Sequence, residues 1–223
     1  EKINFLTNIS HELRTPLTLI VAPLQELIER IKGHWEHEKL SYIQRNTNRL
    51  LHLVNQLMDY RRAELGIFEL RPVYANAYKK VLNCFLNYEN LSKRKDIDYN
   101  LYTELQDEEL LFDETYLDLI VNNLLSNAFK YTEKGECITV RLYKEDNNLV
   151  LQVIDTGVGI PAEKQKKIFE RFYQAESGHE GSGIGLSLVQ RLVELHHGHI
   201  TLESKVGEGS TFSIYIPQDK SMY

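Results

Sequence analysis

The sequence predicts an α+β protein in which a long helical hairpin is followed by an α/β sandwich. Apolar residues recur every three or four positions through the first third of the 223 residues, which is the spacing of helices that pack together. Beyond Gly66, segments typical of strands and helices alternate, and short turn sequences at 146–148 and 206–209 separate pairs of strands. Such turns predict hairpins, and therefore a mixed or largely antiparallel sheet rather than a doubly wound one.

Two apolar stripes predict the helical hairpin. The first consists of Leu6, Ile9, Leu13, Pro16, Ile20, Pro23 and Leu27, and the second of Leu40, Ile43, Thr47, Leu50, Val54 and Leu57. Two helices cannot cover stripes this wide, and each large apolar side chain left in water forfeits about 1.5 to 3 kcal/mol. We therefore expect residues 1–65 to form a four-helix bundle as a homodimer. A monomeric hairpin packed against the rest of the chain is the alternative.

The remaining residues, 66–223, are predicted to form the sandwich. We expect strands near residues 68–72, 97–102, 136–144, 149–155, 199–204 and 210–216, and helices near 75–91, 114–130, 162–172 and 182–196. No apolar run approaches the ~20 residues of a membrane span, so we expect no membrane contact by this segment. The net charge is −6 with acids and bases interspersed, which argues against direct nucleic-acid binding.

His11 is the first candidate for chemistry. Ile9 and Leu13 lie on the buried face of the first helix, and a residue two positions away is rotated by about 200°, so His11 faces outward. Glu12 follows directly, and Pro16 removes the backbone donor that would bond the Glu12 carbonyl, which loosens the helix at that turn. A lone surface histidine is usually only solvated, so its position alone leaves the role open.

A second group lies in the helix predicted at 114–130. Asn123, Asn127, Lys130 and Tyr131 recur at spacings of three and four, which places two amides and an ammonium on one face. Amide oxygens ligate hard cations such as Mg²⁺, and an ammonium contacts phosphate oxygens. An amphipathic helix with an ordinary polar face explains the same pattern.

A third group, Asp155, Gly157 and Gly159, directly follows a predicted strand. Glycines let a flat ligand come close to the backbone, and Asp155 would then accept a hydrogen bond from an exocyclic amine. A tight turn after a strand explains the same residues.

A fourth group opens the helix predicted at 182–196 and consists of Gly181, Ser182, Gly183, Gly185 and Leu186. Glycine-rich backbone at a helix N-terminus presents unpaired N–H groups and a partial positive charge, which suits a phosphate. No Gly-Lys-Ser/Thr follows and no strand directly precedes it, so neither the Walker pattern nor a dinucleotide fold matches.

The order of these groups resembles that of sensor histidine kinases. Segment 5–17 resembles their H box, 123–132 the N box, 155–159 the first glycine box, 168–173 the F box and 181–188 the second glycine box. The resemblance runs from end to end of the chain, and segment 57–64 is further similar to hybrid kinases, in which sensor and regulator share one chain. Gln174 stands where many members carry an arginine, so the chain departs from the family pattern at this position, where a phosphate contact would be assigned.

The resemblance implies an ATP site with Mg²⁺ as cofactor. It places adenine against Asp155 and the glycines that follow it, with Thr211 nearby and Tyr131 near the ring. Asn127 would bind Mg²⁺ and Asn123 would support it. The phosphates would be held by Lys130 and by the glycine segment 181–186.

The resemblance also implies autophosphorylation, with His11 as nucleophile, Glu12 as general base and Thr15 orienting the water of a phosphatase reaction. At an unperturbed pKa near 6.5, about three-quarters of a histidine is neutral at pH 7, so it has a free lone pair. The phosphoryl group would pass to an aspartate of a response-regulator receiver domain, in the same parent chain or a separate one. This segment would lie on the cytoplasmic side of an inner membrane that anchors the parent protein.

Two other functions compete with this one. ATP-hydrolysing switches resemble the same nucleotide-binding fold, but they carry a catalytic glutamate four residues before the metal-binding asparagine, where this chain has Asn123. A degenerate kinase that only binds nucleotide or a partner is the non-enzymatic alternative.

Overall fold

The computed structural model describes residues 20, 21, 24, 27, 39–44, 46, 47, 50, 54, 69–170, 173 and 183–222. The chain divides into two compact units, Glu1–Phe68 and Glu69–Tyr223. The boundary predicted between residues 65 and 66 falls outside the described residues and stays a prediction.

The described residues of the first unit are all helical. Leu24 and Thr47 are buried, and the Thr47 hydroxyl donates to the Ile43 carbonyl at 2.9 Å. Four apolar members of the predicted stripes remain about half exposed in the single chain: Ile20, Leu27, Ile43 and Leu50. The predicted helices are confirmed at these positions, and they leave apolar surface uncovered.

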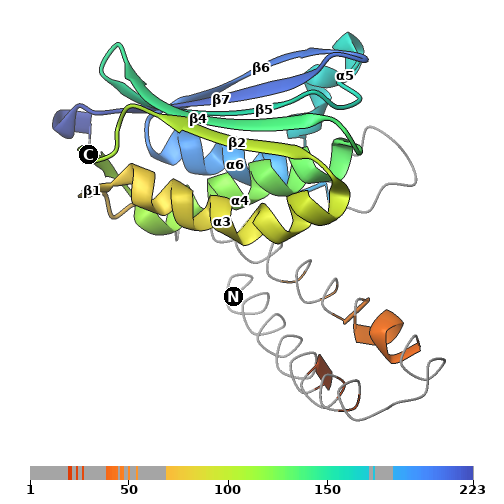
Figure 1. The fold of residues 1–223 in the computed structure, drawn as a ribbon. Helices are drawn as coiled ribbons and strands as arrows, with labels where there is room; N and C mark the ends of the chain where they lie inside the picture. Colours follow the sequence, from red (N-terminus) through yellow and green to blue (C-terminus); the bar gives the residue numbers. More distant parts are fainter. Residues whose placement is uncertain are drawn as a thin grey trace, which may run out of the picture. The chain divides into compact units, whose positions relative to one another are not determined.

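The second unit is a five-stranded sheet with helices on one face (Figure 1). The strands, in the order in which they pair, are β2 (Asp98–Thr103), β4 (Cys137–Glu145), β5 (Asn148–Asp155), β7 (Gly209–Pro217) and β6 (His199–Lys205). The main helices are α3 (Ala77–Lys95), α4 (Glu114–Tyr131) and α6 (Gly185–Leu195). β2 runs parallel to β4, and the other pairs in this sheet are antiparallel. The predicted α+β class with a mixed sheet is thereby confirmed.

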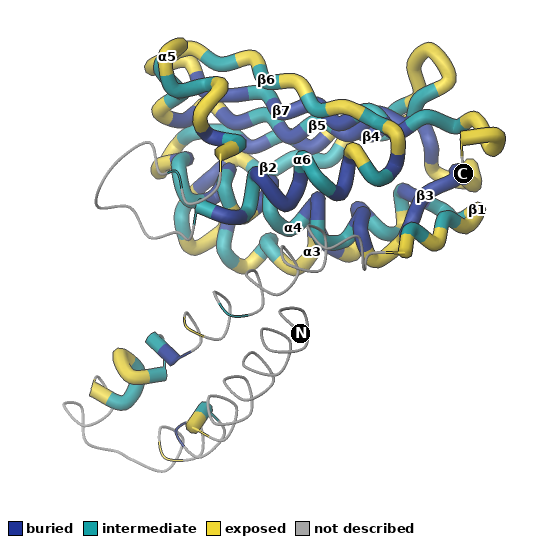
Figure 2. Tube along the Cα trace, turned by 180° about the vertical axis from the view of Figure 1, so that it is seen from behind, coloured by how far each residue is buried: buried dark blue, intermediate teal, exposed yellow. Residues whose placement is uncertain are grey.

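The core lies between the sheet and these helices, where buried residues gather (Figure 2). Side chains alternate along each strand, so Leu151 and Val153 of β5 share the inner face with their partners Ile214 and Phe212 of β7. The helices supply fully or nearly fully buried side chains to the same layer, including Leu117, Ile120, Leu124 and Leu125 of α4 and Leu188 and Leu192 of α6. Each such side chain contributes about 1.5 to 3 kcal/mol relative to exposure.

Side-chain caps set where α4 begins and how it is joined to α6. The Asp113 carboxylate accepts hydrogen bonds from the backbone N–H groups of Thr115 and Tyr116 at 2.9 and 3.1 Å. The Asp113 backbone N–H donates to Nε2 of His196 at 3.1 Å, while Nδ1 of His196 lies 2.7 Å from the Leu192 carbonyl. These partners require a neutral imidazole with its proton on Nδ1, and burial lowers the pKa of His196 accordingly.

At the start of this unit the predicted strand was wrong, whereas the predicted helix is present with shifted ends. The strand expected near 68–72 lies instead at β1 (Val73–Asn76), which pairs antiparallel with β3 (Glu109–Phe112) in a separate two-stranded sheet. β3 was not predicted, because three buried residues in a four-residue strand show no alternation. The helix expected from 75 begins only after Asn76, whose side chain caps the Lys79 N–H at 2.8 Å.

The helix predicted at 162–172 was also wrong. The chain forms only α5 (Ala162–Gln165) and then a 3₁₀ turn, η1 (Lys167–Phe169), after which Glu170 is extended. The Gln165 side chain explains the early end, because its amide donates to the backbone carbonyls of Ile160 and Ser204 at 3.0 and 2.9 Å. These bonds hold the segment against β6 rather than along a helix axis.

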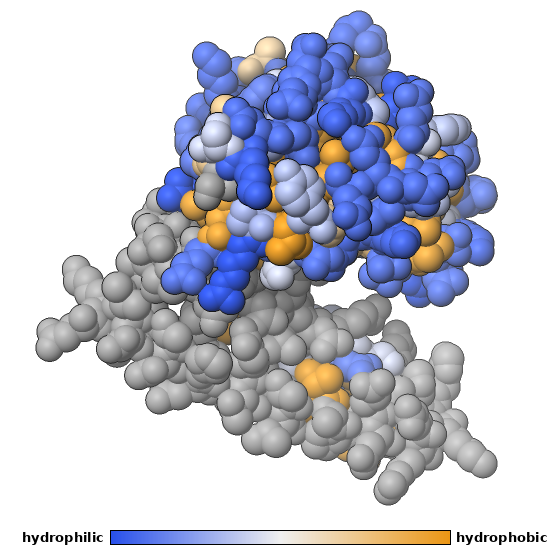
Figure 3. Space-filling view, turned by 90° about the vertical axis from the view of Figure 1, so that its left-hand side faces the viewer, coloured by the Kyte–Doolittle hydropathy of each residue, from blue (hydrophilic) through white to orange (hydrophobic). Residues whose placement is uncertain are grey.

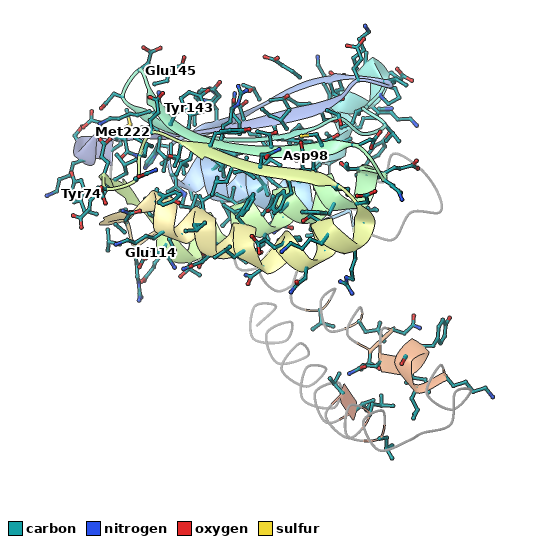
Figure 4. All side chains as sticks on the ribbon, viewed as in Figure 1. Tyr74, Asp98, Glu114, Tyr143, Glu145 and Met222 are labelled. Carbon is teal, nitrogen blue, oxygen red and sulfur yellow. The ribbon has the colours of Figure 1, made fainter. Side chains whose placement is uncertain are left out.

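The two ends of the second unit differ. Figure 4 shows Glu145 of the β4–β5 hairpin at the same end as Tyr74 and Met222, and Asp98, the first residue of β2, toward the opposite end. Seen from the Tyr74 end, the surface is mainly hydrophilic, with apolar atoms in small areas (Figure 3). The Asp98 end also carries Asp155, the last residue of β5. Among the described residues, no helix combines the length and apolar character needed to cross a membrane.

Candidate nucleotide-binding site

The α4 helix divides into a buried face and a polar face, as its sequence predicts. Asn123, Asn127 and Lys130 are half-buried, whereas Leu124 and Ala128 between them lie in the core. The Asn123 amide donates to the Leu119 carbonyl at 2.8 Å, one turn back along the same helix. The predicted amide and ammonium groups therefore lie on one side of one helix.

The last turn of α4 holds the aromatic and cationic candidates together. Nζ of Lys130 lies 4.7 Å from the centroid of the Tyr131 ring, a cation–π distance. The carbonyls of the last turn have no partner within the helix. The Phe129 carbonyl accepts from Nζ of Lys95 in α3, and the Tyr131 carbonyl accepts from the Val158 N–H at 3.3 Å. The loop after β5 is thus bonded to the end of α4.

Gly157 makes this close contact possible. A Cβ at this position would lie 2.1 Å from the Tyr131 carbonyl oxygen and 3.3 Å from Oδ1 of Asp155, so any side chain would push the loop away from α4. Gly159 has φ +68°, in the left-handed region, and a Cβ there would lie 2.0 Å from the Lys205 carbonyl oxygen. Both glycines are needed for close approach of backbone to backbone.

Asp155 ends β5 as a buried carboxylate, 7% exposed. Burial raises the pKa of its carboxyl group to about 6, against backbone hydrogen bonds from Gly157 and Ser210 that lower it. The Gly157 N–H donates to Oδ1 at 3.1 Å. A nearly buried acceptor that is costly to ionise is typical of a ligand site rather than of a structural ion pair.

Ser210, and not Thr211, lies beside Asp155. Asp155 pairs with Ser210 across β5 and β7, whereas Thr211 pairs with Ile154 and therefore has its side chain on the other face of the sheet. Ser210 is 7% exposed and, in turn, pairs with Ser204 of β6. Ser210 and Ser204 were not among the predicted site residues. Ser210 could have been predicted from the alternation along β7. Phe212, Ile214 and Ile216 face the core, so the even-numbered residue Ser210 shares their face.

The second glycine segment is described only in part. Gly181 and Ser182 lie outside the described residues. Gly183 has φ +68°, and Gly185 begins α6, whose N-cap residue, Ile184, makes no side-chain capping bond. Leu186 is the second residue of this helix and is half-buried. The first turn of α6 therefore presents backbone N–H groups without a side-chain cap.

The predicted residues of the first unit, His11, Glu12 and Thr15, lie outside the described residues. In the second unit the structure brings together Tyr131, Asp155 and Gly157 by direct contacts, and it places Asn123, Asn127 and Lys130 on the helix that ends there. A buried acceptor, an aromatic ring and a polar helix face suit a base with an exocyclic amine and a cation-bound polyphosphate.

Two families of known proteins match the chain. Residues 1–66 match the His Kinase A (phospho-acceptor) domain, and residues 112–220 match the histidine kinase-, DNA gyrase B-, and HSP90-like ATPase family. Among solved structures, full-length ShkA in complex with AMPPNP is similar with a TM-score of 0.82 and 25% identity over 96% of this chain and 45% of that one. Histidine kinase ThkA in complex with the response regulator TrrA is similar in fold, with a TM-score of 0.69, 21% identity and coverage of 99% and 63%.

Curated relatives match over nearly the whole chain. Histidine kinase P4 of Formosa agariphila is 36% identical over 97% of this chain, and the circadian input-output histidine kinase CikA of Synechococcus elongatus is 34% identical over 97%. Hybrid signal transduction histidine kinase D of Dictyostelium discoideum is 34% identical over 99%. The chain spans only 16%, 30% and 15% of these three relatives. With a phospho-acceptor domain followed by an ATPase domain, the chain belongs to the sensor histidine kinases, of which it forms the catalytic core.

Proposed function

We propose that this chain binds Mg·ATP in its second unit, phosphorylates His11 in its first, and passes the phosphoryl group to an aspartate of a receiver domain. The observation that carries the proposal is the buried Asp155 carboxylate beside Gly157, in an ATPase-type domain that follows a phospho-acceptor domain on one chain. ShkA was solved with AMPPNP and ThkA with a response regulator, which supports the same ligand and kind of partner here.

The described residues fit ATP. The Asp155 carboxylate would accept a hydrogen bond from an exocyclic amine. Tyr131 ends the helix whose last carbonyl is bonded to the loop after Asp155, so its ring lies at the same end of the unit. Lys130 and the backbone from Gly181 to Leu186 would hold the phosphates, with Gly183 and Gly185 shaping the turn into α6.

The polar face of α4 fits the metal. Asn127 has no side-chain hydrogen bond to another described residue, so its amide oxygen is available as a ligand, with Asn123 one turn away in support. Bound Mg²⁺ would neutralise charge on the β- and γ-phosphates. The catalysis asked of these residues is positioning and charge neutralisation.

His11 supplies the nucleophile. One ring nitrogen attacks the γ-phosphorus, the bond to the ADP oxygen breaks, and Glu12 takes the proton from the other ring nitrogen. Thr15 would orient a water for hydrolysis of the receiver's phosphoaspartate, which gives the core a phosphatase activity as well. The position four before Asn127 is Asn123 rather than a glutamate, which argues against an ATPase switch that activates water.

The chemistry of the phosphorylated residue tests the proposal. Incubation with γ-labelled ATP should label the protein with a phosphate that is lost in acid and stable in base, as expected of phosphohistidine. His11→Gln should remove the label while leaving ATP affinity within about threefold, because the residues that would bind ATP belong to the other unit. His37→Gln, outside the H box, is the matched control and should label normally. Acid-stable labelling, or labelling that survives in His11→Gln, would contradict the assignment.

We further propose a homodimer through the first unit. Ile20, Leu27, Ile43 and Leu50 are each about half exposed in the single chain and belong to the predicted apolar stripes. Covering each completely would recover about half of the 1.5 to 3 kcal/mol of a buried apolar side chain.

The parent protein would be anchored in the inner membrane by segments beyond this one, with the core on the cytoplasmic side.

Leu50→Asp should convert the dimer to monomer, because it places an unpaired charge in the bundle seam at a cost of several kcal/mol. Light scattering of the full chain over a range of concentrations measures the effect. Tyr42→Asp is the matched control, since Tyr42 is 63% exposed and lies outside both stripes. A monomeric wild type, or equal dimerisation of wild type and Leu50→Asp, would rule out this interface.

A further inference from the structure

A short row of polar side chains crosses three strands at the Asp98 end of the sheet. Asp155 of β5, Ser210 of β7 and Ser204 of β6 occupy paired positions on the helix-covered face. Directly opposite residues on one face have Cβ atoms about 4.5–5.5 Å apart, so each polar side chain of the row is next to the following one. The row joins Asp155, the proposed adenine acceptor, to Ser204 on the edge strand. The proposed function assigns no role to Ser204.

The Ser204 side chain uses all of its hydrogen-bonding capacity within the protein. Its Oγ accepts from the backbone N–H of Ile160 at 2.8 Å, donates to the carbonyl of Gly209 at 2.8 Å, and lies 2.9 Å from Oγ of Ser210. Its own carbonyl accepts from the Gln165 amide at 2.9 Å, so the loop 157–165 holds this residue by both backbone and side chain. Ser204 has no freedom to turn away from this arrangement.

These partners determine which serine donates to the other. A hydroxyl has one proton and two lone pairs. The Gly209 carbonyl can only accept, so it takes the Ser204 proton. One Ser204 lone pair already accepts from Ile160, and the second therefore accepts the proton of Ser210. The Ser210 hydroxyl therefore donates its only proton to Ser204. On the side of Asp155 it can only accept a hydrogen bond.

We propose that Ser204 is a positioning residue that sets base specificity by holding the Ser210 hydroxyl as an acceptor beside the Asp155 carboxylate. The inference rests on the proposed ATP site and deepens it. Two neighbouring acceptors match a 6-amino group, which has two protons to donate, either directly or through one water. A 6-oxo base such as hypoxanthine would place an acceptor against both, which leaves buried polar groups unpaired.

Removal of the Ser204 hydroxyl should release the Ser210 proton. In Ser204→Ala, the Ser210 hydroxyl can rotate and donate toward the Asp155 side, so the site then offers one donor and one acceptor. Affinity for Mg·ATP should fall modestly, by about threefold, whereas affinity for Mg·ITP should rise or stay constant. The ratio of the two dissociation constants is therefore the diagnostic quantity, because a merely structural defect lowers both affinities together.

The experiment measures dissociation constants of the full chain for Mg·ATP and Mg·ITP by calorimetry. The wild type should prefer ATP, and Ser204→Ala should reduce that preference at least about threefold. Ser204→Cys keeps the shape but hydrogen bonds weakly, so it should reduce the preference similarly even if the alanine variant folds poorly. In a Ser210→Ala background, Ser204→Ala should cause no further change in preference, because Ser204 acts through Ser210.

The control and the contrary outcomes separate this inference from the proposed function. Ser213→Ala removes a hydroxyl on the opposite face of β7, where Ser213 accepts from the Gln152 amide at 3.0 Å, and should leave the preference unchanged. If the wild type binds ATP but Ser204→Ala keeps the wild-type preference, the role of Ser204 is overturned and the ATP site stands. If the wild type binds neither nucleotide, the proposed function and the inference both fall.

Discussion

Asp155→Asn is expected to abolish ATP binding while making the unliganded fold more stable at neutral pH. The carboxylate is nearly buried, and its two backbone donors only partly offset the cost of desolvation, so the pKa is raised to about 6. The Nδ2 group of asparagine is a donor, so it would face the adenine amine, which is also a donor, and no hydrogen bond could form between them. Loss of a hydrogen bond to a charged group costs about 1.5–3 kcal/mol, and the facing donors add to it, so we expect at least about a 100-fold loss of affinity.

The gain in stability follows from the direction of the pKa shift. A carboxyl whose pKa rises from 3.8 to about 6 on folding is easier to ionise in the unfolded chain. Its contribution to stability is therefore fully present below pH 3.8 and is lost as the pH rises through 6, by about 3 kcal/mol in total. Asparagine does not ionise and avoids this loss. The gain is smaller than 3 kcal/mol, because only Oδ1 of asparagine can accept from the Gly157 and Ser210 N–H groups.

Urea unfolding of wild type and Asp155→Asn between pH 4 and pH 8 measures the effect. The unfolding free energy of Asp155→Asn minus that of the wild type should increase as the pH rises from 4 to 7. His196 titrates with the opposite sign, since burial lowers its pKa and its contribution is lost as the pH falls, but it is common to both proteins and cancels in the difference. Asp98→Asn, at an exposed position of the same end, should change neither stability nor affinity. A pH-independent difference would contradict the buried, costly carboxylate.

Regular alternation and helical spacing were enough to predict most of the second unit. Strands β4, β5, β6 and β7 and helix α4 each lie within one residue of the predicted bounds, because an inner and an outer face are visible over seven or more residues. The two short strands of the small sheet and the break after Gln165 were not predictable in this way. They depend on contacts with residues far along the chain, such as Asp113 with the Arg71 N–H and Gln165 with Ser204.

The candidate site was predictable in composition but not in geometry. Glycines and asparagines at fixed spacing mark Asn123, Asn127, Asp155 and Gly157, whose roles stay predictions. The register of β7 decides whether residue 210 or 211 faces Asp155, and a shift by one position reverses every side chain. Ser204 could not have been found from the sequence at all, since its partners come from β7 and from the loop at Ile160.

Gly157→Ala is expected to disrupt the nucleotide site through a single methyl group. The added Cβ would lie 2.1 Å from the Tyr131 carbonyl oxygen, which belongs to the backbone and cannot rotate away. The loop must move instead, which breaks the Val158 bond to that carbonyl and displaces the Gly157 N–H that holds Oδ1 of Asp155. Forced overpacking of this kind costs about 1–3 kcal/mol. We expect that loss of stability together with at least about a 30-fold loss of ATP affinity.

The matched control is Gly135→Ala, which separates crowding from backbone strain. Gly135 lies between α4 and β4 with φ +83°, and a Cβ there meets no atom within 4 Å. Alanine at this position should cost about 1–2 kcal/mol for its left-handed conformation and leave ATP affinity within about threefold, because the Tyr131 and Asp155 contacts are untouched. Thermal unfolding with and without Mg·ATP measures both effects for each variant. If Gly157→Ala kept the full thermal shift that ATP gives the wild type, the contact between this loop and α4 would have no part in holding the nucleotide.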